Sequence, residues 1–185
     1  MNILETDIKG LLVIEPTINK DERGYFLESY NENVFRELGI GPFVQDNESF
    51  SVARVIRGMH YQLPPYAQAK LVKVMHGRIQ DVAVDIRKNS PTFGKHLSIE
   101  LSEENKKQLY IPKGFAHGFA VLGEKAVLTY KCDGYYNRES EGGILFNDPA
   151  LNIDWNMDTS RAIISKKDLQ WPTLANCRNS FVFEG

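Results

Sequence analysis

The feature that most constrains the fold of this chain is a succession of short apolar stretches interrupted by frequent turn signals. The stretches are rich in Val, Ile, Phe and Tyr, and Gly, Pro, Asn and Asp separate them. The first group of residues favours strands and the second favours turns. Helical signals are confined to 33–38, with an Asn33 cap and a Gly39 stop, and to a turn opening at Ser102. The pattern predicts an antiparallel β sandwich or barrel, and periodicity does not decide between them.

The predicted strands lie almost entirely before residue 147. They cover residues 11–15, 25–29, 43–47, 55–62, 70–75, 78–86, 96–101, 109–111, 117–122, 126–132 and 143–146. Two pairs are predicted as hairpins, one turning at His76-Gly77 and the other at Gly123-Glu124. Beyond them the pattern is irregular, with Trp155 and Trp171 as expected anchors. We expect one domain over 1–185, with a core at about 11–150 and a C-terminal segment, 151–185, packed on it.

Composition excludes several classes of partner. The net charge of −2 gives no reason to expect a nucleic acid or a membrane surface as partner. No apolar run approaches the length of a membrane span, and the first residues lack the pattern of a signal peptide. The two cysteines, Cys132 and Cys177, show no paired or metal-binding spacing, which is typical of free thiols in a reducing compartment. We therefore predict a cytoplasmic protein.

The stretch Arg57-Gly58-Met59-His60-Tyr61-Gln62 is the strongest candidate for chemistry. Imidazole can accept and return protons near neutrality, and a guanidinium suits phosphate or carboxylate. Strict alternation along a strand would place Arg57 and His60 on opposite faces. If both face one pocket, a bulge near Gly58 is required, and glycine is common at bulges. The alternative is an edge strand with a solvated arginine and a structural histidine.

The segment Pro112-Lys113-Gly114-Phe115-Ala116-His117 has the PxGxxH form that resembles the second motif of cupins, which are double-sheet jelly rolls. Metal cupins also need an HxH pair, but Gln62 stands two residues after His60. The remaining histidines, His76 and His96, are scattered and are predicted to be solvated. Because a metal site needs several convergent ligands, we predict none here.

Three further residues could complete an acid–base site. Tyr130 lies in an apolar run and would donate a proton if it faced His60, although a tyrosine there is usually part of the core. Asp168 would fix the tautomer of His60 if it folded back on it, and is otherwise a surface acid. Lys70 could stabilise an enolate oxygen, or remain a solvated strand end. Nucleophile elbows, phosphate loops and dinucleotide motifs are all missing, which favours acid–base chemistry without a cofactor.

With these residues assembled, the chain resembles the dTDP-4-dehydrorhamnose 3,5-epimerase family from about Leu11 to Asp168. The resemblance rests on numerous motifs in a fixed order, which are Asp21-Glu22-Arg23-Gly24, Phe26-Leu27-Glu28-Ser29-Tyr30, Val44-Gln45-Asp46-Asn47, the Arg57–Gln62 stretch, Lys70-Leu71-Val72, Asp85-Ile86-Arg87 with Ser90-Pro91-Thr92-Phe93-Gly94, Ile111 through Phe119, and Asn147-Asp148. The chain departs from the family at Met59 and Tyr61, where Leu and Phe are common, and at Asn156, where proline is usual.

The resemblance implies an all-β, cupin-type jelly roll with short peripheral helices, working without metal or cofactor as a homodimer that exchanges N-terminal strands. It implies epimerisation of a dTDP-4-keto-6-deoxyhexose at carbons 3 and 5, in dTDP-L-rhamnose biosynthesis. By analogy His60 is the base, Asp168 its partner, Tyr130 the opposing acid and Lys70 the enolate stabiliser. The positions that match substrate-binding residues are Arg23, Glu28, Gln45, Asn47, Arg57, His117, Glu141 and Lys167, and some are expected to reach the neighbouring subunit's site.

Three other readings of the sequence remain. The first is an enzyme that epimerises only one carbon of a related nucleotide 4-keto sugar, with the same base and acid and a different pocket shape. The second is a sugar-nucleotide binding module without catalysis, which would not need the set of His60, Tyr130 and Asp168. The third is a metal cupin, against which the missing HxH spacing argues.

Overall fold

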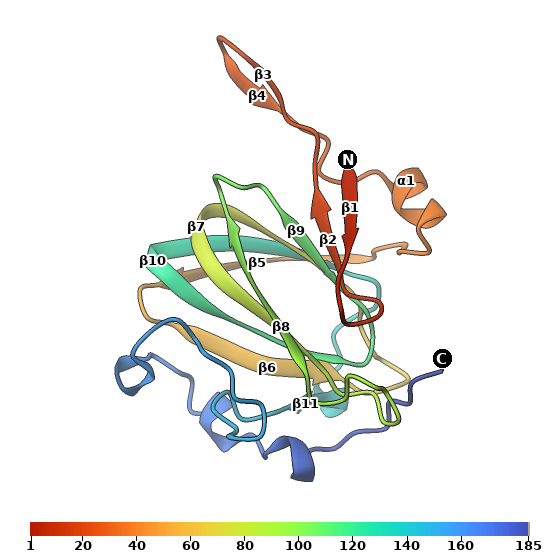
Figure 1. Cartoon of the computed structure of the whole chain (residues 1–185), viewed down its shortest axis with the longest axis vertical. Helices are drawn as coiled ribbons and strands as arrows, with labels where there is room; N and C mark the ends of the chain where they lie inside the picture. The colour runs from red at the N-terminus through yellow and green to blue at the C-terminus, as the bar shows by residue number, and fades with distance from the viewer. Residues whose placement is uncertain (185) are drawn as a thin grey trace.

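A computed structural model describes residues 1–184 and confirms the cupin-type jelly roll. Nine antiparallel strands form one hydrogen-bonded sheet that rolls into two facing layers, and a separate two-stranded hairpin projects from it (Figure 1). The strands are β1 (Asn2–Glu5), β2 (Leu12–Glu15), β3 (Asn19–Asp21), β4 (Gly24–Phe26), β5 (Gln45–Val52), β6 (Ile56–Gln62), β7 (Lys70–Asp85), β8 (His96–Ser102), β9 (Gln108–Ile111), β10 (Phe115–Cys132) and β11 (Glu141–Gly143). The short helices are α1 (Glu32–Glu37), η1 (Arg138–Ser140), η2 (Thr159–Arg161), η3 (Asp168–Gln170) and η4 (Leu174–Asn176).

The two long strands β7 and β10 run through both layers, so the two predicted hairpins are wrong. The first part of β7 pairs with β9 and the second with β8, while β10 pairs with β6 and then with β5. The expected turns are bends within these strands, with φ +76° at Gly77 and a shift in register between Val121 and Ala126. A glycine bend and a turn have the same local signature, and strands that switch sheets bend at such points.

The main core fills the space between the two layers. Val72 and Val74 from one half of β7 and Ile79 from the other are buried there, together with Leu128 and Phe119 of β10. Side chains of this interior alternate with outward-facing ones along each strand, as a pleated sheet requires. The polar residues on these inner-facing positions are therefore directed into the barrel, where a site can form.

Both layers are also covered on their outer faces. The C-terminal segment packs Trp155 and Phe181 against the outward side chains of the second layer, including Val82, Val84 and Met59. The helix α1 covers the first layer through Phe35, which is fully buried. Burial on both faces explains why residues 82–86 read as an almost continuous apolar run.

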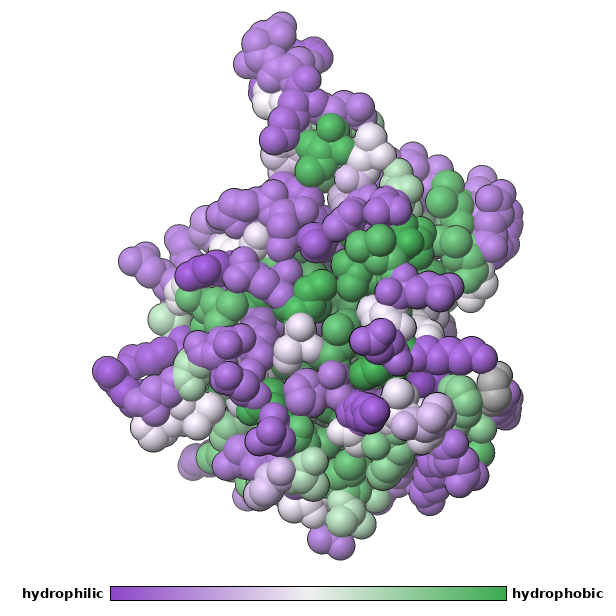
Figure 2. Space-filling view, in the orientation of Figure 1, coloured by the Kyte–Doolittle hydropathy of each residue, from purple (hydrophilic) through white to green (hydrophobic). Residues whose placement is uncertain are grey.

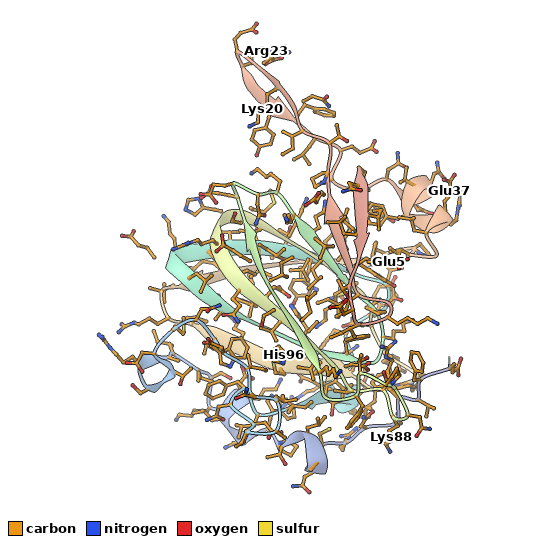
Figure 3. All side chains as sticks on the ribbon, in the orientation of Figure 1. Glu5, Lys20, Arg23, Glu37, Lys88 and His96 are labelled. Carbon is orange, nitrogen blue, oxygen red and sulfur yellow. The ribbon has the colours of Figure 1, made fainter. Side chains whose placement is uncertain are left out.

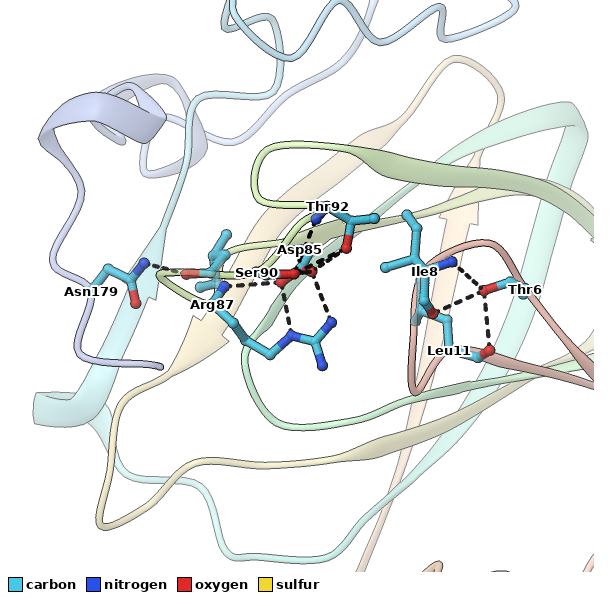
Figure 4. Close-up of polar contacts among 9 residues, drawn as sticks. Thr6, Ile8, Leu11, Asp85, Arg87, Ser90, Thr92 and Asn179 are labelled. Carbon is cyan, nitrogen blue, oxygen red and sulfur yellow. Dashed lines mark hydrogen bonds and ion pairs between the residues drawn. The ribbon is translucent and has the colours of Figure 1, made fainter. Parts of the chain in front are cut away.

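A buried polar network fastens one end of the barrel (Figure 4). The carboxylate of Asp85 accepts bonds from the Arg87 guanidinium at 2.8 and 2.9 Å, and from the hydroxyls of Ser90 and Thr92 at 2.6 and 2.7 Å. Beside it, the Asn179 side chain donates to a backbone carbonyl of this end and ties the C-terminal tail to it. Because these bonds favour the charged carboxylate, they outweigh burial and lower the pKa of Asp85.

Several boundaries differ from the sequence prediction. The cap of α1 is Asn31 rather than Asn33, since the Asn31 side chain accepts from the Asn33 amide. The strand predicted at 43–47 begins at Gln45 and continues to Val52, with residues 46, 48, 50 and 52 exposed and the residues between them more buried. The strand predicted at 25–29 is shortened to β4, the expected helical turn after Ser102 is a plain turn, and β1 was not predicted.

The hairpin of β3 and β4 extends away from the barrel. Arg23 lies at its tip with its side chain 83% exposed, and Figure 3 shows it far from the strands that enclose the interior. Figure 2 shows a hydrophilic tip with apolar surface below it. Phe26, the last residue of β4, is 70% exposed. No helix of residues 1–184 is long and apolar enough to span a membrane.

Candidate active site

The β6 strand carries the bulge that was expected if Arg57 and His60 face one pocket. Between Arg57 and His60 the strand advances three residues, while its partner β10 advances only two, from Phe119 to His117. The extra residue is accommodated at Gly58, which has φ +135° and passes so close to β10 that an added Cβ would lie 2.5 Å from Gly118 Cα. The bulge turns Arg57 and His60 to the same side, and both line one cavity.

His60 is paired with a buried carboxylate from the C-terminal segment. Its Nε2 lies 2.7 Å from Oδ1 of Asp168, and the backbone N–H of Gly58 donates to Oδ2 of Asp168 at 3.3 Å. Burial raises the pKa of Asp168, but the bond and charge of His60 and the Gly58 amide outweigh it and lower that pKa overall. The pair leaves Nδ1 of His60 for a substrate. Asp168 therefore folds back on His60, the position in which it could fix the imidazole tautomer.

A cavity of about 290 Å³ lies in the barrel interior beside His60. One wall comes from the second layer, with His60 and Gln62 on β6 and Glu141 on β11. The other wall comes from the first layer, with Gln45 and Asn47 on β5, Lys70 on β7 and Tyr130 on β10. His60 and Tyr130 therefore reach the cavity from opposite layers.

Lys70 and Tyr130 are neighbours on the wall that the first layer forms. The Nζ of Lys70 lies 5.8 Å from the centre of the Tyr130 ring. Burial lowers the pKa of Lys70 below that of a free lysine, since the charged form loses hydration. Burial also raises the pKa of Tyr130, with a smaller contribution from Cys132 in the same direction. The tyrosine consequently keeps its proton at neutral pH.

A second cavity of about 370 Å³ lies on the other side of His60, with Arg57, Lys167 and Asp168 among its lining residues. Arg57 is held by bonds to Ser51 Oγ and the Phe50 carbonyl, both at 3.0 Å. Lys167 forms an ion pair with Glu141, with Nζ 2.5 Å from Oε1. The ion pair links the two cavities. In the second one, the Arg57 guanidinium is a group suited to an anion.

Three of the expected binding residues lie outside these cavities. His117 pairs in register with His60, but it is buried, and its Nε2 lies 2.9 Å from a carboxylate oxygen of Asp81. Arg23 and Glu28 lie in or after the projecting hairpin, both exposed, and Arg23 pairs only with Asp21. The structure thus brings Gln45, Asn47, Arg57, Glu141 and Lys167 to the site of this chain, but not Arg23 or Glu28.

Sequence reasoning missed some residues of the site. Tyr136 lines the first cavity and donates to Glu141 Oε2 at 3.1 Å, and Ser51 orients Arg57. Trp171 was expected only as an anchor, yet its ring lies 6.2 Å from that of His60. The proximity of Trp171 to Asp168 in the chain was the one available signal, because a residue three positions beyond a catalytic candidate stays near it.

The arrangement can move protons on two sides of one bound molecule. A paired imidazole on one wall can remove a proton, a protonated phenol on the other can supply one, and an ammonium lies beside the phenol. Within residues 1–184, no group of three His, Cys, Asp or Glu side chains is arranged to hold a metal ion. The other two histidines were predicted to be solvated. His76 is exposed beside Glu103, whereas His96 is partly buried.

The jelly roll and the groups in its interior define a cupin-like protein with an acid–base site. A family model for dTDP-4-dehydrorhamnose 3,5-epimerase matches residues 5–176. The enzyme of that name from Shigella flexneri is 51% identical over 91% of this chain and 93% of its own length. The chain therefore belongs to the dTDP-4-dehydrorhamnose 3,5-epimerase family and is an isomerase of nucleotide-sugar biosynthesis.

Solved structures agree with this membership. The dTDP-4-dehydrorhamnose 3,5-epimerase from Elizabethkingia anophelis is 53% identical, with a TM-score of 0.92, over 95% of this chain and 97% of that one. The dTDP-6-deoxy-D-glucose-3,5-epimerase from Legionella pneumophila was solved in complex with dTDP-4-keto-L-rhamnose. It is 50% identical, with a TM-score of 0.90, over 95% of this chain and 93% of that one. At such identities, the likeness extends beyond the fold to the enzyme family.

Proposed function

We propose that His60, Asp168, Tyr130 and Lys70 carry out the family reaction in this chain. The reaction epimerises dTDP-4-dehydro-6-deoxy-D-glucose at carbons 3 and 5 to dTDP-4-dehydro-L-rhamnose, in dTDP-L-rhamnose biosynthesis. The observation that carries the assignment is that His60 and Tyr130 line one cavity from opposite layers. Epimerisation needs proton-exchanging groups on two opposite sides of the substrate, because the proton must leave one face of the sugar and return on the other.

The proposed first step is removal of the proton on carbon 5, beside the carbon 4 ketone. Nδ1 of His60 takes the proton, and the C–H bonding electrons move to the ketone oxygen to form an enolate. Asp168 stabilises the resulting imidazolium through its 2.7 Å contact with Nε2. A base alone gives about 10²- to 10⁴-fold acceleration, so the charge on the oxygen also has to be stabilised. We assign that role to Lys70.

The second step returns a proton from the opposite face. The Tyr130 hydroxyl gives its proton to carbon 5 and the enolate electrons re-form the ketone. Water then takes the proton from the His60 imidazolium and returns one to the Tyr130 phenolate, which resets both groups. The raised pKa of Tyr130 supports this role because the phenol is protonated before the step. The same sequence at carbon 3 inverts the second centre. In this scheme no group other than the side chains and water exchanges a proton.

We assign the diphosphate of the substrate to the second cavity. Arg57 and Lys167 line it, and a guanidinium or an ammonium suits phosphate oxygens. Gln45, Asn47 and Glu141, on the walls of the first cavity, are assigned to the sugar. His117 is assigned a supporting role behind His60, because its Nε2 is engaged by Asp81.

Arg23 and Glu28 are best explained by a homodimer that exchanges N-terminal strands. The hairpin extends away from its own barrel, so these two side chains would complete the cavity of a partner subunit. A mixture of R23A and H60N chains tests this. Neither variant has a complete site alone, but a mixed dimer has one, and random exchange gives about a quarter of wild-type activity because half of the dimers are mixed. No recovery, or a monomer in sedimentation, contradicts the assignment.

Proton exchange in deuterated water tests the reaction itself. The protein is incubated with dTDP-4-dehydro-6-deoxy-D-glucose, carbons 3 and 5 are followed by NMR, and product is trapped by a rhamnose-forming reductase. Deuterium at both carbons with reducible product is the expected result, and H60N should abolish both. Label at a single carbon would instead indicate an enzyme that inverts one centre. Binding without label would indicate a non-catalytic module.

A further inference from the structure

Trp171 lies beside the proposed catalytic pair of His60 and Asp168, against the backbone of β11. It follows the η3 turn that carries Asp168, and its indole ring rests on the backbone of Gly143. A Cβ added at Gly143 would lie 2.4 Å from two ring carbons of Trp171, so only glycine leaves room for the indole. Gly143 is also the register partner of His60 between β11 and β6. Sequence and fold thus bring Trp171, His60 and Asp168 together.

The contacts of the indole join both members of the pair. Its ring meets that of His60 edge to face, with centroids 6.2 Å apart and planes at 68°, within the range that aromatic pairs favour. The indole N–H is buried and has no partner with hydrogen-bond geometry in residues 1–184. It nevertheless lies close enough to the Asp168 carboxylate to help lower the pKa of that group. Lys167 lies 5.6 Å from the ring centre.

We propose that Trp171 is a positioning residue that holds the His60 imidazole against Asp168 and shields the pair from water. This inference rests on the proposed role of His60 as the base. The indole limits rotation of the imidazole because it occupies the space beside it. It also withholds water from the pair. Without the indole, the imidazole turns more freely, and the Nε2-protonated tautomer that Asp168 fixes is less populated.

Other charged groups near His60 set the background against which Trp171 acts. They come from every element around the imidazole and are Arg57 on the same strand, Lys70 on β7, His117 and Tyr130 on β10, Glu141 on β11, and Lys167 and Asp168 at η3. None of them is removed by a substitution at Trp171. A change in the His60–Asp168 pair would therefore report the loss of the indole.

The test compares W171A, W171F and G143A with wild type. G143A leaves the indole in the chain but displaces it, since its new methyl group occupies the ring position. The control is W155F, at the second tryptophan, which is also buried and whose Nε1 donates to the Phe146 carbonyl at 2.9 Å away from the pair. The fraction of His60 in the Nε2-protonated tautomer, read from the imidazole nitrogen NMR signals that are missing in H60N, is measured together with kcat and KM.

We expect W171A and G143A to lower the fraction of His60 in the Nε2-protonated tautomer, with a smaller loss in W171F, which keeps a ring. In the same variants kcat should fall about tenfold with KM less changed, because a base out of place costs mainly the chemical step. W155F should lose stability but show neither change.

An unchanged His60 tautomer and a wild-type kcat in W171A and G143A would overturn the proposal. If W171A fails to fold, W171F and G143A decide by the same criteria. The NMR measurement does not depend on turnover, so it separates this inference from the proposed function. Full activity in H60N would refute His60 as the base, whereas a changed His60 tautomer in W171A would still show that Trp171 positions the imidazole.

Discussion

Replacing Asp168 by Asn removes one charge from the centre of the site with almost no change in shape. The carboxylate is buried, with its side chain 5% exposed, and contacts an imidazole whose side chain is 31% exposed. A hydrogen bond to a charged group contributes about 1.5–3 kcal/mol, which corresponds to roughly 10- to 150-fold in rate if it forms fully only when His60 is protonated. The amide can also donate to Nε2, which would place the remaining proton on Nδ1 and remove the base.

We therefore expect D168N to lower kcat by about 10²-fold, since the imidazolium that forms during the reaction loses its counter-charge. Deuterium uptake at carbon 5 and the reductase-coupled rate measure the change. The control is D148N, which alters another buried carboxylate that accepts only backbone N–H bonds, from Ala150 and Leu174. Turnover in D168N within threefold of wild type would refute the assigned pairing.

Three more substitutions test separate parts of the structure. Y130F should retain part of the deuterium uptake at carbon 5 but form no product with inverted centres, and normal turnover would exclude Tyr130 as the acid. K70M should lower kcat by about 10²- to 10³-fold, as loss of an oxyanion donor does, and should remove a loss of activity that wild type shows as rising pH deprotonates this lysine. D85N should cost about 3 kcal/mol in urea unfolding at pH 7, because Arg87 loses its buried partner. Since the pKa of Asp85 is lowered in the fold, that stability is present above its unfolded pKa and is lost as pH falls through the folded one, and D85N should lack this dependence.

Local sequence was sufficient wherever the structure is determined by neighbours along the chain. The alternation of apolar residues located most strands of the barrel, and the spacing of Arg57 and His60 implied the bulge at Gly58. Bends and turns could not be separated in the same way. Gly77 has a turn-like conformation in either case, and only the pairing of β7 with two different strands shows that the chain continues.

Long-range relations in the site were predictable only through the resemblance. Asp168 and His60 are 108 residues apart, and no local pattern connects a lysine-rich segment to an interior strand. The partner of His117 was equally hidden, since Asp81 lies within an apolar run that reads as core. Arg23 could be matched to the family by its motif, but its distance from the cavity depends on the direction of the hairpin, which sequence does not specify.

The bulge at Gly58 explains why the base and its partner occur together in this fold. By adding one residue to β6, it turns His60 to the side of Arg57, and the Gly58 amide is left outside the β6–β10 register pairs. Asp168 accepts that amide at one oxygen and contacts His60 at the other. A regular strand would place Arg57 and His60 on opposite faces and would use the amide of residue 58 within the sheet. The same backbone irregularity therefore orients the base and anchors the carboxylate that stabilises it, while close packing of Gly58 on Gly118 keeps it in place.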